Sequence, residues 1–129
     1  MPGVLRGMHY HLRQADLWVP IEGQATVGLC DLRRGSPADR RASTVELEPG
    51  LALYLPPGIA HGFFARTPFT MLYLVDRAYD GSDEHGFSPL DPALGIDWPA
   101  ADVVLSERDR TASSLADALV ATPVDPWVG

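Results

Sequence analysis

Residues Gly3 to Gly23 read GVLRGMHYHLRQADLWVPIEG, and this stretch decides the expected fold. His9 and His11 are separated by one residue, and residues two apart on a strand point to the same face. Both imidazoles can therefore enter one pocket. Asp16 follows on the same arm of a hairpin, and Gly23 ends that arm.

Short apolar or alternating runs, separated by turn residues, continue this pattern over the first 75 residues. The chain has 12 glycines and 12 prolines, so regular elements must be short. Strands are expected over residues 17–21, 25–32, 44–47, 51–55, 61–65 and 70–75. Strands this short and this evenly spaced are typical of an antiparallel sandwich or barrel.

With 129 residues, the chain is long enough for one domain with one core. We expect a core barrel over about 3–76, ordered loops over 77–104 and a C-terminal helix over about 106–121. Ser106 with Asp109 three residues later resembles a capping box at the start of that helix, and Pro123 ends it.

Composition narrows the class of protein. All 10 basic residues are arginine, 17 residues are acidic, and the formal net charge is -7, which disfavours binding to nucleic acid. The absence of lysine excludes a Schiff base on a lysine side chain. The sequence has no apolar run of membrane-spanning length and no apolar leader segment, so we expect a cytoplasmic protein without a membrane partner. The single cysteine, Cys30, is expected to be a buried core thiol.

A second stretch, from Gly50 to His61, adds a third histidine. Together the two stretches resemble the two sequence motifs of the cupin superfamily, a small double-sheet antiparallel barrel or jelly roll. The resemblance implies one metal-binding pocket built from His9, His11, Asp16 and His61. Imidazoles and a carboxylate suit Fe, Mn, Ni, Cu or Zn. In the superfamily pattern, glutamate is usual at the position of Asp16.

A more specific resemblance covers nearly the whole chain. Its segments are 3–9 (GVLRGMH), 31–37 (DLRRGSP), 54–63 (YLPPGIAHGF), 71–73 (MLY), 91–99 (DPALGIDWP) and 105–109 (LSERD). In this order they resemble the dTDP-4-dehydrorhamnose 3,5-epimerase family, whose members have the cupin fold and normally need no metal. The resemblance implies carbohydrate biosynthesis, a nucleotide-linked 4-keto-6-deoxy sugar as substrate, and a homodimer.

The same resemblance implies a catalytic set. His9 matches the base that removes the proton next to the ketone, and Asp91 matches its carboxylate partner. Tyr73 matches the proton donor.

The substrate-binding residues implied by the resemblance also lie in these motifs. Arg6 matches an arginine that can pair with the nucleotide's phosphate, and His61 matches a second pocket histidine. His11 is expected beside them in the same pocket.

Several pocket positions depart from the family pattern. Asp16 stands where members usually have a lysine that stabilises the enolate, and His11 stands where they have a glutamine. The family's N-terminal segment has no counterpart here, so the chain resembles a divergent, N-terminally short member.

Three functions stay open: an epimerase or related isomerase, a metal-dependent cupin enzyme, and a small-molecule-binding cupin without catalysis.

Overall fold

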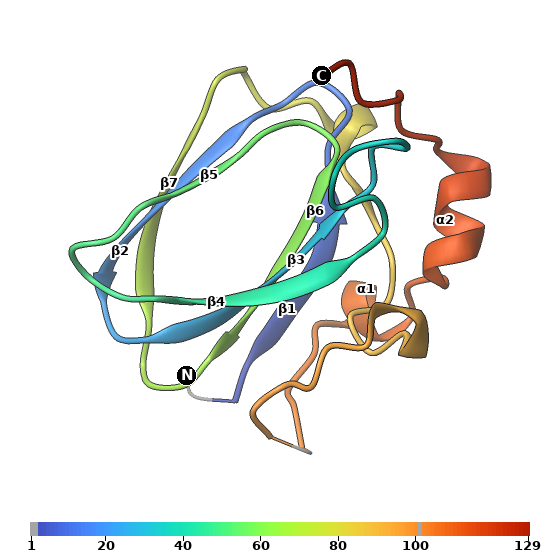
Figure 1. Ribbon diagram of the computed structural model, residues 1–129. Helices are drawn as coiled ribbons and strands as arrows, with labels where there is room; N and C mark the ends of the chain where they lie inside the picture. Colours follow the sequence, from blue (N-terminus) through green and yellow to red (C-terminus); the bar gives the residue numbers. More distant parts are fainter. Residues whose placement is uncertain (1–2, 101) are drawn as a thin grey trace.

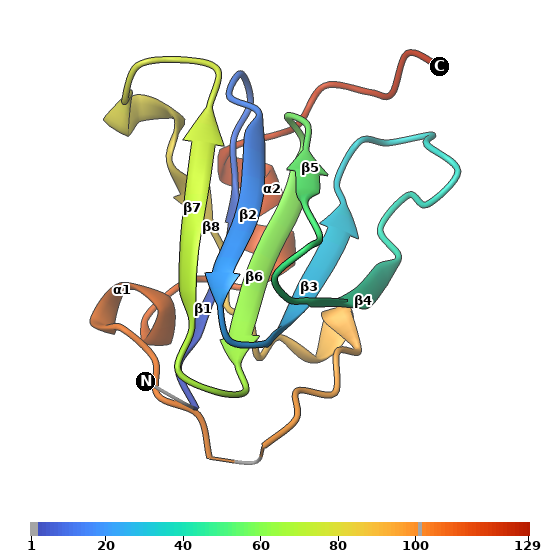
Figure 2. The same cartoon turned by 90° about the vertical axis from the view of Figure 1, so that its left-hand side faces the viewer.

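Two antiparallel sheets face one another in the computed structural model, which describes residues 3–100 and 102–129 (Figure 1). The strands are β1 (Leu5–Tyr10), β2 (Asp16–Glu22), β3 (Ala25–Asp31), β4 (Ala42–Leu47), β5 (Leu53–Leu55), β6 (Ile59–Ala65), β7 (Thr70–Val75) and β8 (His85–Gly86). The larger sheet has the order β4-β3-β6-β1-β8, and the smaller has the order β5-β2-β7. Figure 2 shows the smaller sheet in front of the larger one. The expected all-β, double-sheet jelly roll is confirmed.

The hairpin between β2 and β3 turns at Gly23, as the sequence predicts. Gly23 has a φ of 87°, a conformation that other residues rarely adopt. A Cβ atom there would lie 2.0 Å from the carbonyl oxygen of Pro68. The turn therefore needs glycine both for its backbone angle and for the close approach of the loop before β7.

Strand β1 presents different residues to its two faces. Met8 and Tyr10 are fully buried against the C-terminal segment, and the Tyr10 hydroxyl donates to the carbonyl oxygens of Ala118 and Thr122 at 3.2 and 3.0 Å. His9, between them, points to the space between the sheets. The alternation of the strand thus separates packing residues from cavity residues.

The larger core cluster covers the outer face of the five-stranded sheet. It includes Leu5, Cys30, Phe87, Trp98 and Leu115. Figure 1 shows helix α2 on this face, on the side away from the smaller sheet. A smaller cluster between the sheets contains Trp18, Val27, Leu47 and Leu55. Cys30 is 1% exposed, so the expected burial of this thiol is confirmed.

The C-terminal region differs from the single expected helix over 106–121. The structure has two short helices, α1 (Glu107–Arg110) and α2 (Leu115–Ala121). The chain breaks between them because Ser114 acts as a second N-cap, its hydroxyl accepting the Asp117 N–H at 3.1 Å.

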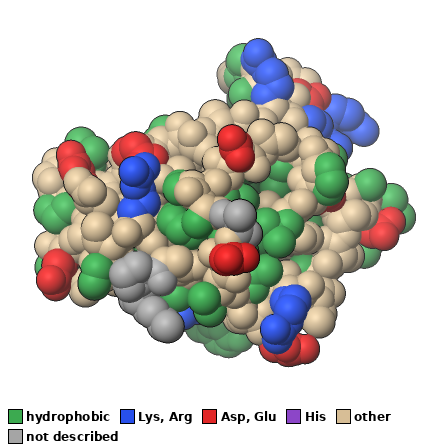
Figure 3. Space-filling model, turned by 90° about the horizontal axis from the view of Figure 1, so that it is seen from below, with side chains coloured by type: hydrophobic (Ala, Val, Ile, Leu, Met, Phe, Trp, Pro, Cys, Tyr) green, Lys and Arg blue, Asp and Glu red, His purple; other side chains and the backbone are tan. Residues whose placement is uncertain are grey.

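The region expected to be loop, 77–104, also contains regular structure. It holds the short strand β8, which extends the larger sheet beside β1, and two 3₁₀ helices, η1 (Gly81–Asp83) and η2 (Pro92–Leu94). Within the described residues, no helix has the length and apolar character needed to cross a membrane. Figure 3 shows arginine and acidic side chains interspersed on the face seen from below.

Candidate active site

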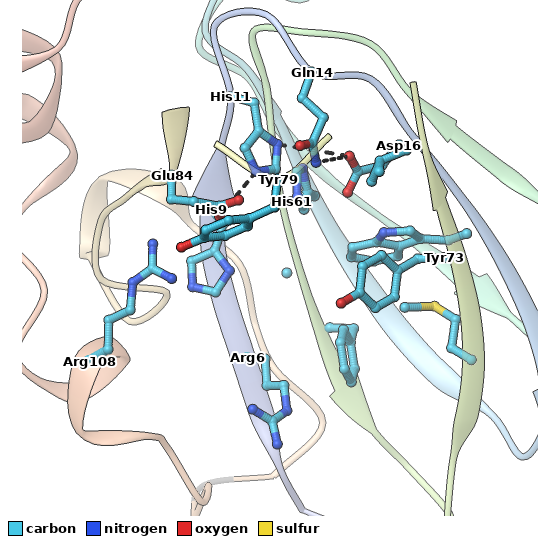
Figure 4. Close-up of a pocket in the computed structure, with 15 residues that line it drawn as sticks. Arg6, His9, His11, Gln14, Asp16, His61, Tyr73, Tyr79, Glu84 and Arg108 are labelled. Atoms are coloured by element: carbon cyan, nitrogen blue, oxygen red, sulfur yellow. Dashed lines mark hydrogen bonds and ion pairs between the residues drawn. The ribbon is translucent and has the colours of Figure 1, made fainter. Parts of the chain in front are cut away.

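A cavity of about 700 Å³ opens between the two sheets. Its walls come from β1 and β6 of the larger sheet, from β2 and β7 of the smaller sheet, and from segments after β7 and in α1. Six residues singled out in the sequence line it: Arg6, His9, His11, Asp16, His61 and Tyr73 (Figure 4). The expectation that His9, His11 and His61 share one pocket therefore agrees with the structure.

His9 forms a close pair with Asp109 of α1. The Nε2 atom of His9 lies 2.7 Å from Oδ1 of Asp109, whose side chain is 4% exposed. The other carboxylate oxygen accepts the Gly7 N–H at 3.2 Å. Because a carboxylate only accepts, neutral His9 carries its proton on Nε2, which leaves the lone pair on Nδ1. This arrangement suits a general base held by a carboxylate.

The expected pairing of His9 with Asp91 is wrong. The two carboxylate oxygens of Asp91 accept the Ala93 N–H at 2.9 Å and the Leu115 N–H at 2.7 Å. Asp91 thus caps η2 and the start of α2, because its short side chain can satisfy the free N–H groups at helix starts.

The sequence predicts only a capping role for Asp109, and one of the two capping-box contacts is present. The Asp109 N–H donates to the Ser106 hydroxyl at 3.1 Å, but the Asp109 carboxylate turns to His9 instead of back to Ser106. The LSERD segment was already part of the family resemblance. An acidic residue at its end was the available signal for this partner.

His11, Asp16 and His61 form a second group, separate from the His9 pair. One ligand atom from each lies within 4.8 Å of the other two, and all three residues are buried. The four-residue metal set expected from the sequence therefore divides, because His9 is held by Asp109. Burial lowers the pKa of His61 to about 4, so this imidazole is neutral near neutral pH.

Hydrogen bonds orient each member of this group. His61 Nδ1 lies 3.0 Å from the carbonyl oxygen of Ile59, and His11 Nε2 lies 3.3 Å from a carboxylate oxygen of Glu84. The Gln14 amide donates to Asp16 at 2.7 Å. Glu84 and Gln14 line the cavity but were not singled out from the sequence.

Two tyrosines line the cavity, one expected and one not. Tyr73 extends from β7, and Tyr79 follows in the loop after that strand. Figure 4 shows Tyr79 on the side of His9 and Arg108, and Tyr73 on the side of β7. Both residues are largely exposed to solvent, so either hydroxyl is accessible to a ligand.

The cavity also contains two arginines. Arg6 of β1 was expected from the sequence, whereas Arg108 of α1 was not. Figure 4 shows their guanidinium groups at the side of the cavity away from Asp16. Guanidinium groups bind phosphate oxygens in a bidentate way, so this side suits an anionic group.

Known proteins are similar to this chain in sequence. A family model described as dTDP-4-dehydrorhamnose 3,5-epimerase matches residues 1–117. The chain is 40% identical over 121 residues to the dTDP-4-dehydrorhamnose 3,5-epimerase of Streptomyces griseus, covering 89% of this chain and 60% of that protein. It spans about three-fifths of the length of the curated relatives it matches.

Solved structures show the same architecture. A 4-keto-6-deoxy sugar epimerase from the novobiocin biosynthetic gene cluster of Streptomyces spheroides superposes with a TM-score of 0.90 at 38% identity, covering 98% of this chain and 66% of that one. A histidine-to-asparagine, tyrosine-to-phenylalanine double mutant of a 3′-monoepimerase from Streptomyces bikiniensis, in complex with dTDP, gives 0.88 at 33% identity, covering 98% and 67%.

Proposed function

Because the chain belongs to the dTDP-4-dehydrorhamnose 3,5-epimerase family, we propose that it epimerises a dTDP-linked 4-keto-6-deoxy sugar. The observation that carries the proposal is the His9–Asp109 pair, whose free Nδ1 belongs to a cavity residue. A cavity of about 700 Å³ falls within the range of roughly 300–1,000 Å³ that is typical of small-molecule binding pockets.

The proposed reaction replaces the proton on one carbon of the sugar. His9 Nδ1 takes the proton from a carbon next to the ketone, and the electrons of the broken C–H bond form an enolate. The Asp109 carboxylate stabilises the imidazolium that results. An acid on the opposite face of the sugar then gives a proton to the same carbon, which inverts its configuration. Exchange with water afterwards takes the proton from His9 and returns one to the acid.

A tyrosine hydroxyl is the proposed acid, and two candidates line the cavity. Tyr73 is the residue implied by the sequence resemblance, and it extends from the sheet opposite His9. Tyr79 is supported by its spacing from His9. The sequence separation between His9 and Tyr79 equals that between the histidine and the tyrosine that are substituted in the S. bikiniensis relative. We therefore favour Tyr79 and keep Tyr73 as the alternative.

The two arginines are the proposed anchor for the nucleotide. Arg6 and Arg108 are cationic groups in a chain whose net charge is -7, so they create a local positive site for a diphosphate. This charge would hold the sugar toward the His9 end of the cavity.

A homodimer is also proposed. Strand β7 forms one edge of the smaller sheet, and its Leu72 and Leu74 side chains are each 50% exposed. Exposed apolar groups on an edge strand are suited to pairing with a second copy. Light scattering on the purified chain distinguishes a dimer from a monomer.

Deuterium incorporation tests the proposed activity directly. In D₂O, the wild-type chain should exchange a carbon-bound proton next to the ketone of a dTDP-linked 4-keto-6-deoxy sugar, and His9→Ala should not. His85→Asn is the matched control, because His85 lies outside the residues that line the cavity. Tight binding of the sugar nucleotide without exchange would contradict the epimerase proposal and favour a binding protein.

A further inference from the structure

We infer that Asp83 is a positioning residue: its carboxylate fixes the segment that carries Tyr79 and thereby sets where the Tyr79 hydroxyl lies in the cavity. Asp83 is the last residue of η1, in the connection 76–84 between β7 and β8. Tyr79 belongs to the same connection, and Figure 4 shows it on the side of the cavity where His9 lies. The inference rests on the proposed function only for the role of Tyr79 as the acid, because the placement of the segment does not depend on any activity.

The Asp83 carboxylate joins two connections that are far apart in the sequence. Its Oδ1 accepts the Leu12 N–H at 2.7 Å, and its Oδ2 accepts the N–H groups of Arg13 and Gln14 at 2.9 and 3.2 Å. All three donors lie in the connection 11–15 between β1 and β2. Asp83 is 3% exposed, so water competes little for these hydrogen bonds. Because hydrogen bonds to a charged acceptor are stronger than neutral ones, the carboxylate is a firm link between the two connections.

The same contacts keep the Asp83 carboxylate charged. Burial alone would raise the pKa of Asp83, but the three N–H groups, with a smaller contribution from the charge of Arg13, hold this pKa below its usual value. Asp83 is therefore ionised at neutral pH and keeps both oxygens as acceptors. An asparagine of nearly the same size would lack one of these acceptors.

Tyr79 lies between two anchored points of its connection. At the start, the Ala15 N–H donates to Asp76 Oδ1 at 3.0 Å, and the Asp76 N–H donates to the Ala15 carbonyl oxygen at 3.3 Å. At the end, Asp83 accepts its three backbone N–H groups. The Tyr79 side chain is 82% exposed, so it has little packing of its own to fix it. Its position therefore follows from the backbone that these two anchors hold.

Other contacts between the two connections are exposed to solvent. The Arg77 Nε–H donates to the Arg13 carbonyl oxygen at 2.9 Å. The Arg13 guanidinium pairs with Asp80 at 2.8 Å, and both of these side chains are 50% exposed. Ion pairs in contact with water contribute little to stability. Asp83 is thus the buried anchor, and Asp80 offers an exposed comparison on the same segment.

The Tyr79 hydroxyl lies close to η1. A Cβ atom on Gly81, the first residue of η1, would lie 3.1 Å from the Tyr79 hydroxyl oxygen. Asp83 is the last residue of the same short helix, so a shift of η1 displaces the backbone beside the hydroxyl. A displacement of about 1 Å can cost on the order of 100-fold in rate when the displaced group takes part in the reaction.

Matched substitutions test the role of Asp83 in catalysis. Asp83→Asn nearly keeps the size of the side chain but removes one acceptor oxygen. Asp80→Asn makes the same change at an exposed ion pair and keeps a side chain that can cap η1. In Asp83→Asn, we expect inversion to fall by roughly 10–100-fold relative to deuterium exchange at the original configuration, whereas Asp80→Asn should keep the wild-type ratio. Partial unfolding would lower both rates equally and leave their ratio unchanged.

Fluorine NMR tests the placement of Tyr79 without any substrate. The chain is labelled with fluorotyrosine, and Tyr79→Phe identifies the resonance of Tyr79. Asp83→Asn should shift or broaden this resonance and leave that of Tyr73, held in β7, unchanged. Asp80→Asn should move neither. If wild type exchanges no carbon-bound proton, the proposed function fails, but the Tyr79 resonance still decides the placement.

Two results in folded Asp83→Asn would overturn the inference. One is a Tyr79 resonance that does not move. The other is an unchanged ratio of inversion to exchange under conditions where Tyr79→Phe lowers that ratio.

A second variant and a wild-type measurement apply if thermal melts show that Asp83→Asn does not fold. Gly81→Ala places a methyl group 3.1 Å from the Tyr79 hydroxyl oxygen, closer than ordinary van der Waals contact, so the hydroxyl must move. It should lower the ratio of inversion to exchange and shift the Tyr79 resonance. In wild type, amide hydrogen exchange tests the carboxylate link itself. An unmoved Tyr79 resonance in folded Gly81→Ala, or fast exchange of the three amides that donate to Asp83, would contradict the inference.

Discussion

His9 and Asp109 lie 2.7 Å apart although 100 positions separate them in the chain. The contact joins β1, near the start of the chain, to the short helix α1 near its end. The carboxylate has a second contact with the Gly7 N–H, and the Ser106 hydroxyl fixes the backbone of Asp109. The Asp109 carboxylate, the Gly7 N–H and the Ser106 hydroxyl together determine where the His9 ring points, so the position of the proposed base depends on the C-terminal segment.

Replacing Asp109 by asparagine should impair catalysis while keeping the shape of the site. Asparagine can still accept a hydrogen bond from His9, but it lacks the negative charge that stabilises an imidazolium. We expect the rate of deuterium exchange to fall by roughly 10²–10⁴-fold. The melting temperature, measured on the same samples, shows whether the fold is retained. Wild-type exchange by folded Asp109→Asn would remove this carboxylate from the mechanism.

Replacing Asp91 should lower the stability of the fold and leave the rate of deuterium exchange unchanged. Its carboxylate oxygens accept N–H groups at the starts of η2 and α2, so Asp91→Ala loses two capping contacts. The loss of a cap typically costs about 1 kcal/mol, and we expect about 1–2 kcal/mol in the free energy of unfolding, measured with urea. The exchange rate per folded molecule should stay near the wild-type value. A large loss of exchange without a loss of stability would restore Asp91 to the active site.

The contrast between these two aspartates shows what the sequence could predict. The pocket histidines could be predicted because strand alternation places His9 and His11 on one face. The turn motifs around Gly50 and Gly58 indicate that His61 lies in the same pocket. Asp109 was missed because local capping already explained its position relative to Ser106. A side chain's long-range partner depends on how the C-terminal segment folds back on β1, and no local pattern specifies that path.

The sequence did not predict several features of the C-terminal half, because they also depend on contacts with distant parts of the chain. Strand β8 has two residues and exists because it pairs with β1, not because of its own composition. The break between α1 and α2 follows from Ser114 capping a new helix, which competes with continuation of the first. Tyr79 lies in a loop without periodicity, so its place in the cavity required the tertiary structure.

The two cavity tyrosines can be separated by matched substitutions. If Tyr79 is the acid, Tyr79→Phe should slow inversion by roughly 10²–10⁴-fold, while Tyr73→Phe changes it much less. Each change removes one hydroxyl from a largely exposed side chain, so stability should alter little. Proton abstraction by His9 can continue without the acid, and exchange at the original configuration should therefore outlast inversion. The reverse ranking of the two variants would assign the acid to Tyr73.

The buried thiol of Cys30 should make the stability of the fold sensitive to alkaline pH. Burial raises the pKa of this thiol to about 11, because the thiolate would lose its hydration in the core. In the unfolded chain the group titrates near 9, so the unfolded state loses this proton first as the pH rises. Stability from this group is therefore complete below pH 9 and declines toward pH 11, by about 2–3 kcal/mol.

Urea unfolding of wild type and Cys30→Ala between these pH values isolates that contribution. The variant loses core volume at every pH, but the difference in unfolding free energy between the two proteins should shrink as the pH rises. Other groups that titrate in this range affect both proteins and cancel in the comparison. A thiol reagent provides a second readout at pH 8: Cys30 is 1% exposed, so it should react in urea and resist labelling in the folded chain. Rapid labelling of the folded chain, together with a constant difference across the pH range, would show that the thiol is not buried as described.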